Sequence, residues 1–177
     1  MKNAAVALSL FGGSVNAGGG HTMTGLAAFA KYKKDPEGAR RAFYESAPVQ
    51  KDIKNFQSSM SKINSLEDFL GDRKSLKFIL TAFGLESELN NPGKLKAIIN
   101  SDPNDVNSYA NRLSDTRYGK LNKFLNVKSE GFTKLQNAAA QTKVIDDYLT
   151  NAFEVAIGRE NPAAREAVFF LRRINDI

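Results

Sequence analysis

The apolar positions of this chain recur at helical spacings along most of its length. From residue 24 onward they return every three or four positions, which is the period of one face of an α-helix. Sustained alternation of apolar and polar residues between hairpin turns, the pattern typical of strands, is missing from the sequence. The sequence therefore predicts an all-α protein, a compact domain of about eight to ten helices that follows a Gly-rich N-terminal arm.

The clearest helix boundaries lie in the middle of the chain. Asp72 and Asp115 each precede an amphipathic run, as N-cap residues do. The first run ends at Gly84 and the second at Asn126, and both residue types adopt the left-handed backbone of a helix C-terminus. This partial duplication suggests antiparallel helix pairs joined by short turns.

Other boundaries follow from prolines and glycines. Pro36, Pro92 and Pro162 each stand where a helix begins, because their fixed φ suits the first helical position. A long helix with a wide apolar face is predicted near residues 139–157, ending at Gly158. After Asp102, a turn and a cap are predicted to precede a helical run of apolar residues, comprising Val106, Tyr109, Ala110 and Leu113.

An apolar stripe with alternating spacings of four and three residues follows Pro48. Its members are Val49, Ile53, Phe56, Met60 and Ile63. Two heptads are too few for an independent coiled coil. Two interpretations stay open: this helix lies on the core of its own domain, or the stripe is a seam that binds a partner helix.

Residues 1–22 have a different composition from the rest. A short apolar stretch after Lys2 resembles a secretory signal, which would be cleaved near Ala17. The stretch is short and is followed by five glycines, so we favour an uncleaved, mobile arm, with residues 23–177 as a single helical domain. His21, the only histidine, lies in this arm and is expected to be solvated.

Composition and charge exclude several function classes. The 177 residues contain no cysteine, which excludes a disulfide framework, thiolate metal sites and a cysteine nucleophile. No apolar run approaches the ~20 residues of a membrane helix, so no transmembrane segment is predicted. The net charge of +6 is interleaved with acidic residues along the chain, which indicates a solvated helical surface and no nucleic-acid binding.

No residue pattern in the sequence indicates catalysis, a cofactor site or a metal site. Asp146 and Asp147 are adjacent on a predicted helix, so their side chains diverge by about 100° and form no acid–base pair. Asp102 and Asp105 crowd a turn without the glycine and glutamate of a calcium loop. The chain is therefore predicted to be no enzyme and to hold no cofactor or metal.

Two arginines beside the capping aspartates are the most distinctive polar residues. Arg73 follows Asp72, and Arg117 lies two residues after Asp115. In one interpretation each arginine pairs with a nearby carboxylate or carbonyl of its own chain. In the other, the two arginines mark one surface that binds a partner protein.

Several segments resemble a bacterial domain family of unknown function, found mostly in alphaproteobacteria. The most specific are Ala-Phe-Gly-Leu at residues 82–85 and Ala-Asn-Arg-Leu-Ser-Asp-Thr-Arg-Tyr at residues 110–118. Residues 48–53, 65–68 and 165–173 are also similar to the family, so that the resemblance runs from about Pro48 to the C-terminus. Asn126 stands where the family usually has glycine.

The resemblance implies an all-helical protein associated with the flagellum, since genes of this family often lie among flagellar genes. The expected function is structural or in assembly, with rod, hook or basal-body proteins as partners and the flagellum as the location. The alternative is a cytoplasmic helper that binds a flagellar client. A periplasmic location would follow if residues 1–20 were a signal peptide. The resemblance carries over no active-site residue.

Overall fold

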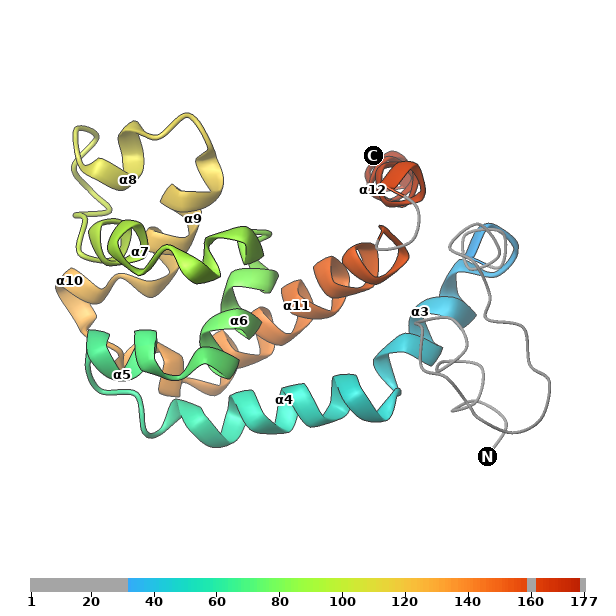
Figure 1. Ribbon diagram of the computed structural model, residues 1–177, viewed down its shortest axis with the longest axis horizontal. Helices are drawn as coiled ribbons and strands as arrows, with labels where there is room; N and C mark the ends of the chain where they lie inside the picture. The colour runs from blue at the N-terminus through green and yellow to red at the C-terminus, as the bar shows by residue number, and fades with distance from the viewer. Residues whose placement is uncertain (1–31, 159–161, 176–177) are drawn as a thin grey trace. The chain divides into compact units, whose positions relative to one another are not determined.

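The structure, a computed structural model, describes residues 32–158 and 162–175. Every regular element in these ranges is helical, which confirms the predicted all-α class (Figure 1). The predicted arm at residues 1–22 and His21 lie outside the described residues. The α-helices are α3 (Pro36–Tyr44), α4 (Ala47–Met60), α5 (Leu66–Gly71), α6 (Arg73–Ala82), α7 (Pro92–Ile99), α8 (Tyr109–Arg112), α9 (Thr116–Leu125), α10 (Val127–Glu130), α11 (Ala138–Gly158) and α12 (Pro162–Asn175), and the two 3₁₀ helices are η1 (Glu86–Asn90) and η2 (Thr133–Gln136).

The helix starts follow from the polar caps that the sequence indicates. Ser65 and Asp68 form a capping box at α5, in which each side chain accepts the backbone N–H of the other at 3.0 Å. Asp72 accepts the N–H of Ser75 at the start of α6, and Asp115 accepts the N–H of Arg117 at the start of α9. These bonds satisfy N–H groups that have no partner within a helix.

The described helices fall into two compact units. Among the described residues, one unit comprises 32–51, 152–158 and 162–175, and the other comprises 52–151. In the first unit, the Phe153 ring of α11 lies 5.5 Å from the rings of Tyr32 and Phe43, and Val168 of α12 is fully buried. That residues 23–177 form a single domain stays a prediction.

Helix α6 is the centre of the second unit. Seven of its ten residues are buried. The Phe78 ring stacks on Phe56 of α4 at 4.5 Å and on Tyr148 of α11 at 3.7 Å. Aromatic pairs of this kind contribute about 0.5–1.5 kcal/mol beyond their burial. At the end of α6, the Ala82 carbonyl accepts a hydrogen bond from Asn151 Nδ2 of α11 at 2.7 Å.

The segment after Asp102 differs from the sequence-based prediction. The predicted helical run is a single turn, α8, and the side chains of Val106 and Tyr109 are 77% and 48% exposed. Asp102 and Asp105 each accept the backbone N–H two residues later, both at 2.9 Å. Because such Asx turns give the backbone an alternative to helical hydrogen bonds, they hold this segment as consecutive turns.

The end of α9 generates a testable prediction. Asn126 is in the left-handed region, with φ 47° and ψ 38°. We expect Asn126→Val to lower the free energy of unfolding by about 1–2 kcal/mol relative to Asn126→Gly, because a β-branched residue is strained in this conformation. Both variants lose the hydrogen bond from Asn126 to Glu130, so the difference between their free energies of unfolding reports the backbone strain alone. Urea denaturation followed by circular dichroism measures it, and equal stability of the two variants would contradict the prediction.

Candidate functional site

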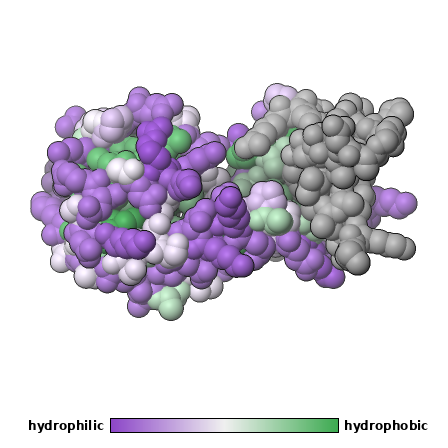
Figure 2. Space-filling model, turned by 60° about the horizontal axis from the view of Figure 1, so that its bottom comes forward, coloured by the Kyte–Doolittle hydropathy of each residue, from purple (hydrophilic) through white to green (hydrophobic). Residues whose placement is uncertain are grey.

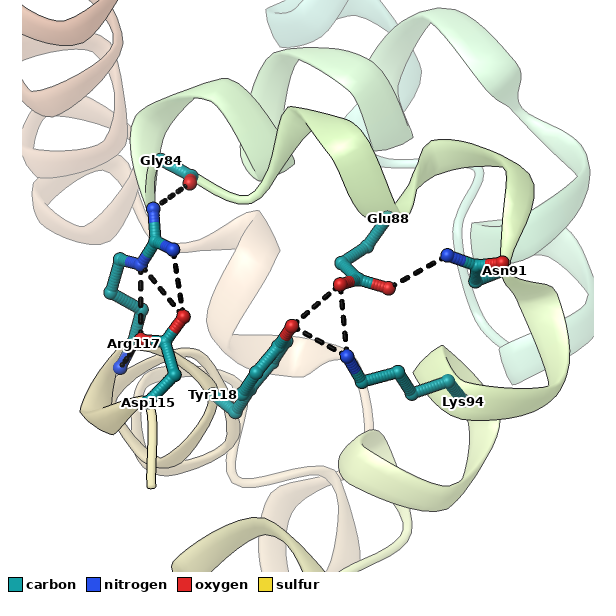
Figure 3. Close-up of polar contacts among 7 residues, drawn as sticks. All are labelled: Gly84, Glu88, Asn91, Lys94, Asp115, Arg117 and Tyr118. Atoms are coloured by element: carbon teal, nitrogen blue, oxygen red, sulfur yellow. Dashed lines mark hydrogen bonds and ion pairs between the residues drawn. The ribbon is translucent and has the colours of Figure 1, made fainter. Parts of the chain in front are cut away.

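Four polar side chains meet where η1, α7 and α9 converge, and we call them the Glu88 cluster (Figure 3). Glu88 Oε1 accepts hydrogen bonds from Tyr118 Oη at 2.5 Å and from Lys94 Nζ at 2.9 Å. Glu88 Oε2 accepts from Asn91 Nδ2 at 2.9 Å, and Lys94 Nζ also donates to Tyr118 Oη at 2.6 Å. Glu88 and Tyr118 are buried, with 8% and 7% of their surface exposed.

Glu88 reaches this place because α6 ends at a left-handed glycine. Gly84 has φ 67°, and the next residue, Leu85, donates its N–H back to the Leu80 carbonyl at 2.7 Å. Leu85 is thereby buried, and η1 begins directly after it, which places Glu88 against α9. Pro92 then begins α7, which carries Lys94.

The cluster has a defined protonation state. The hydrogen bond from Tyr118, and then the one from Lys94, hold the pKa of Glu88 below its usual range. Hydrogen bonds with Tyr118 and Glu88 raise the pKa of Lys94, and the bond to Glu88 raises the pKa of Tyr118. At neutral pH the cluster therefore contains a carboxylate, an ammonium and a neutral phenol. All three pKa values move away from neutrality, whereas a general acid or base works best with a pKa near the operating pH.

The two arginines singled out in the sequence lie at opposite ends of the segment that carries Glu88. Arg73 donates to the Leu89 carbonyl at 2.9 Å and to Asn90 Oδ1 at 2.8 Å. Arg117 donates to the Gly84 carbonyl and forms an ion pair with Asp115 at 2.7 Å (Figure 3). These bonds fit the interpretation that each arginine pairs within its own chain, and a role in binding a partner stays a prediction.

The apolar stripe of α4 is largely internal. Val49, Phe56, Met60 and Ile63 are at most 5% exposed, and Ile53 is half-buried. These positions support the interpretation that the helix packs on the chain's own core. A role for the stripe as a partner seam stays a prediction, and it would require these side chains to become accessible.

Sequence reasoning missed Glu88 and Lys94, and it placed Tyr118 only on an apolar face. Residues 86–91 carry no helical periodicity, so they read as a link between helices. The available signal was an acidic residue between two strong boundaries, Gly84 and Pro92. A segment confined in this way must stay close to the helices it joins.

The surface of the described residues is mainly polar. In the view of Figure 2, hydrophilic residues cover most of the described surface, with small hydrophobic areas between them. The large apolar side chains that stay exposed are Val106 and Tyr109 in the second unit and Phe170 of α12 in the first. Within residues 32–158 and 162–175, no three acidic or histidine side chains are grouped to hold a metal ion. No helix in these ranges is long and apolar enough to span a membrane.

Comparisons with known proteins support the fold and leave the activity open. The model of a family described as a protein of unknown function (DUF1217) matches residues 82–177. No curated protein matches the chain significantly. The crystal structure of a protein from Agrobacterium tumefaciens superposes with a TM-score of 0.70 at 22% identity, covering 88% of this chain and 70% of that chain. At this identity the likeness supports the all-α fold alone.

The protonation state of the cluster predicts how stability depends on pH. We expect Glu88→Gln to lower the free energy of unfolding by about 1–3 kcal/mol at pH 7, because Lys94 and Tyr118 lose a charged acceptor. Since the pKa of Glu88 is lowered in the folded protein, its contribution is fully present above its unfolded pKa of about 4.3 and is lost as the pH falls below that value. Urea titrations from pH 7 down to about pH 3 measure the free energy of unfolding of wild type and of Glu88→Gln. We expect the difference between these two free energies to become smaller only below about pH 4.

Glu67→Gln is the matched control, because Glu67 is an exposed glutamate of the same unit with a long ion pair to Lys96. We expect this variant to leave the stability at pH 7 nearly unchanged. A difference between wild type and Glu88→Gln that stays constant at every pH would contradict the assigned ionisation of Glu88.

The two arginines predict a local effect on backbone dynamics. We expect Arg73→Met and Arg117→Met each to speed amide hydrogen exchange at Leu85 and Glu88 by about three- to tenfold, since a partly exposed charged hydrogen bond contributes ~1 kcal/mol. Lys77→Met is the control, because Lys77 is an exposed cation of α6 that holds no part of this segment. Equal exchange rates in all three variants would contradict the expectation that Arg73 and Arg117 hold the segment that carries Glu88.

Proposed function

The chain belongs to the DUF1217 family, and we propose that it acts without catalysis, through protein–protein contacts, as a structural or assembly component of the bacterial flagellum. Its partners would be rod, hook or basal-body proteins, and its location the flagellum. The proposal rests on three separate supports: the state of the polar cluster, the exposed apolar side chains and the sequence resemblance.

The non-enzymatic part of the proposal is supported by the internal pairing of the Glu88 cluster. The Glu88 carboxylate is buried and accepts three hydrogen bonds from its own chain. Lys94 Nζ donates to two of the same partners, Glu88 and Tyr118. Groups that saturate one another in this way act as a structural joint, because a substrate would have to displace a charge-assisted bond to reach any of them.

The proposed partner-contact surface rests on one observation, which is that the side chains of Val106 and Tyr109 are exposed. Val106 lies in the consecutive turns after Asp102, and Tyr109 is the first residue of α8, directly after these turns. Aromatic side chains are enriched where protein interfaces form. We therefore assign the first partner-contact surface to residues 102–109, in place of the buried stripe of α4.

The flagellar part of the proposal is supported by the segments that resemble the alphaproteobacterial family. Residues 82–85 and 110–118, the most specific of these segments, lie inside the range that the family model matches. They also build the observed site, because they contain Gly84, Arg117 and Tyr118.

Site-specific photo-crosslinking in motile cells tests the function and the surface together. A photoreactive amino acid replaces Val106 in one strain and the exposed Lys77 in a control strain. Purified hook–basal bodies, cytosol, periplasm and culture medium are then immunoblotted for the protein. We expect a crosslinked species from position 106 in the hook–basal-body fraction, and a much weaker one from position 77.

The other outcomes separate the alternatives. A crosslinked species confined to the cytosol would replace the structural role with that of a helper bound to a flagellar client. A shortened protein in the periplasm would show that residues 1–20 are a cleaved signal and would contradict a flagellar location. Equal crosslinking from both positions would contradict the assigned surface.

A further inference from the structure

The two exposed side chains of the partner-contact surface belong to different pieces of backbone. Val106 lies in the consecutive turns, whereas Tyr109 is the first residue of α8. A segment of turns with an exposed backbone and few buried contacts opens more easily than a helix packed on the core. Val106 and Tyr109 therefore form one fixed surface only if a further interaction connects the turns to α8.

Asn111 of α8 makes that connection. Its Nδ2 donates to the Asp105 carbonyl at 2.8 Å and to the Pro103 carbonyl at 3.2 Å. The two bonds hold the backbone that immediately precedes Val106 against α8. An amide NH₂ group carries two donor hydrogens, which matches these two carbonyls, whereas the amide oxygen would find no donor in the same place. The orientation of the Asn111 amide is thus determined by the carbonyls that it meets.

Gly119 of α9 leaves the space that Asn111 occupies. A Cβ atom at position 119 would lie 3.2 Å from Asn111 Oδ1, whereas ordinary van der Waals contact begins at about 3.4 Å. Gly119 lies inside α9 and does not have a positive φ, so alanine would suit the helix itself better. The close approach of the Asn111 side chain therefore gives this glycine its structural reason.

Two further bonds hold the ends of the same segment. The Ala110 N–H donates to Ser101 Oγ at 3.1 Å, on the side of α8. Lys128 pairs with Asp102 at 3.2 Å, where the turns begin. The Asn111 side chain holds the middle of the segment, between these two points.

We propose that Asn111 is a positioning residue for the partner-contact surface, which it presents to the partner protein with Val106 and Tyr109 in one fixed arrangement. Gly119 contributes to this role because it gives the Asn111 side chain its place. The inference rests on the proposed function, since it takes residues 102–109 as the surface that binds. A surface that is ordered before the encounter loses less conformational entropy on binding, and the partner therefore binds it more tightly.

Hydrogen exchange followed by NMR on the purified full chain tests whether Asn111 holds the turns. Asn111→Asp keeps the size of the side chain but removes both donors. The amides of Asn107 and Ser108 report on the segment, because both donate to Asp105. We expect Asn111→Asp to speed their exchange by about three- to tenfold, the effect of losing one hydrogen bond.

Asn100→Asp is the matched control for this measurement. Asn100 is an exposed asparagine just before the segment, and its side chain bonds to no residue that the structure describes. The two variants therefore make the same chemical change and the same change in net charge. We expect Asn100→Asp to leave both exchange rates within about twofold of wild type.

Photo-crosslinking from position 106 tests whether the partner depends on Asn111. Strains with the photoreactive amino acid at position 106 also carry Asn111→Ala, Gly119→Ala or Asn100→Ala, none of which adds a charge to the surface. The readout is the crosslinked fraction of the protein in purified hook–basal bodies. We expect Asn111→Ala to lower this fraction by about three- to tenfold. Gly119→Ala should lower it less, and Asn100→Ala should leave it unchanged.

Global stability separates a positioning role from loss of the fold. Alanine has a higher helix propensity than glycine, so we expect the urea midpoint of Gly119→Ala to be no lower than that of wild type while its crosslinked fraction falls. Circular dichroism verifies that Asn111→Ala is folded. A crosslinked fraction that follows the urea midpoint in every variant would overturn the positioning role, because unfolding alone would then account for the loss.

The outcomes also separate this inference from the proposed function. Equal crosslinked fractions for wild type and Asn111→Ala, or equal exchange rates for Asn111→Asp and Asn100→Asp, would overturn the positioning role and leave the partner-contact surface in place. The absence of crosslinks from position 106 in otherwise wild-type protein would instead overturn the partner-contact surface itself, and with it the role of Asn111 in binding.

Discussion

The second unit depends on one constraint: a carboxylate taken out of water must be paired. Glu88 meets that constraint with three donors from its own chain, which come from α7, from α9 and from the residue before α7. Removing a single partner would leave a buried charge poorly compensated, which costs several times more than an exposed ion pair contributes. The positions of η1, α7 and α9 are therefore coupled through one carboxylate.

Polar groups elsewhere in the unit satisfy backbone atoms in the same way. Asn122 of α9 is fully buried, and its Nδ2 lies within hydrogen-bond reach of the Ile98, Ile99 and Ser101 carbonyls at the end of α7. The last carbonyls of a helix have no intrahelical partner, so a donor from a neighbouring helix fixes how two helices meet. Asn122 thus donates to carbonyls at the end of α7, just as Arg73 donates to the Leu89 carbonyl at the end of η1.

These internal bonds leave particular surfaces for contact with other molecules. The apolar stripe of α4 and the aromatic rings stacked on Phe78 belong to the core, whereas Val106 and Tyr109 face outward. The segment that carries Val106 adjoins α8, whose Ala110 N–H donates to Ser101 Oγ at 3.1 Å. Recognition surfaces commonly occur on connecting segments that a rigid scaffold positions.

Much of the fold could be predicted from the sequence, because helix boundaries are set by local chemistry. Asp72, Asp115 and Asn126 act on backbone groups within a few residues, and each was assigned correctly. The turn expected at Asp102 is present, but the helical run expected after it is a single turn, because two Asx turns compete with the helix. The Glu88 cluster could be recognised only in three dimensions. Glu88 and Tyr118 are thirty residues apart, and no local pattern records that they meet. The sequence alone determined the boundaries that capping residues mark, and tertiary packing decided which polar residues became buried partners.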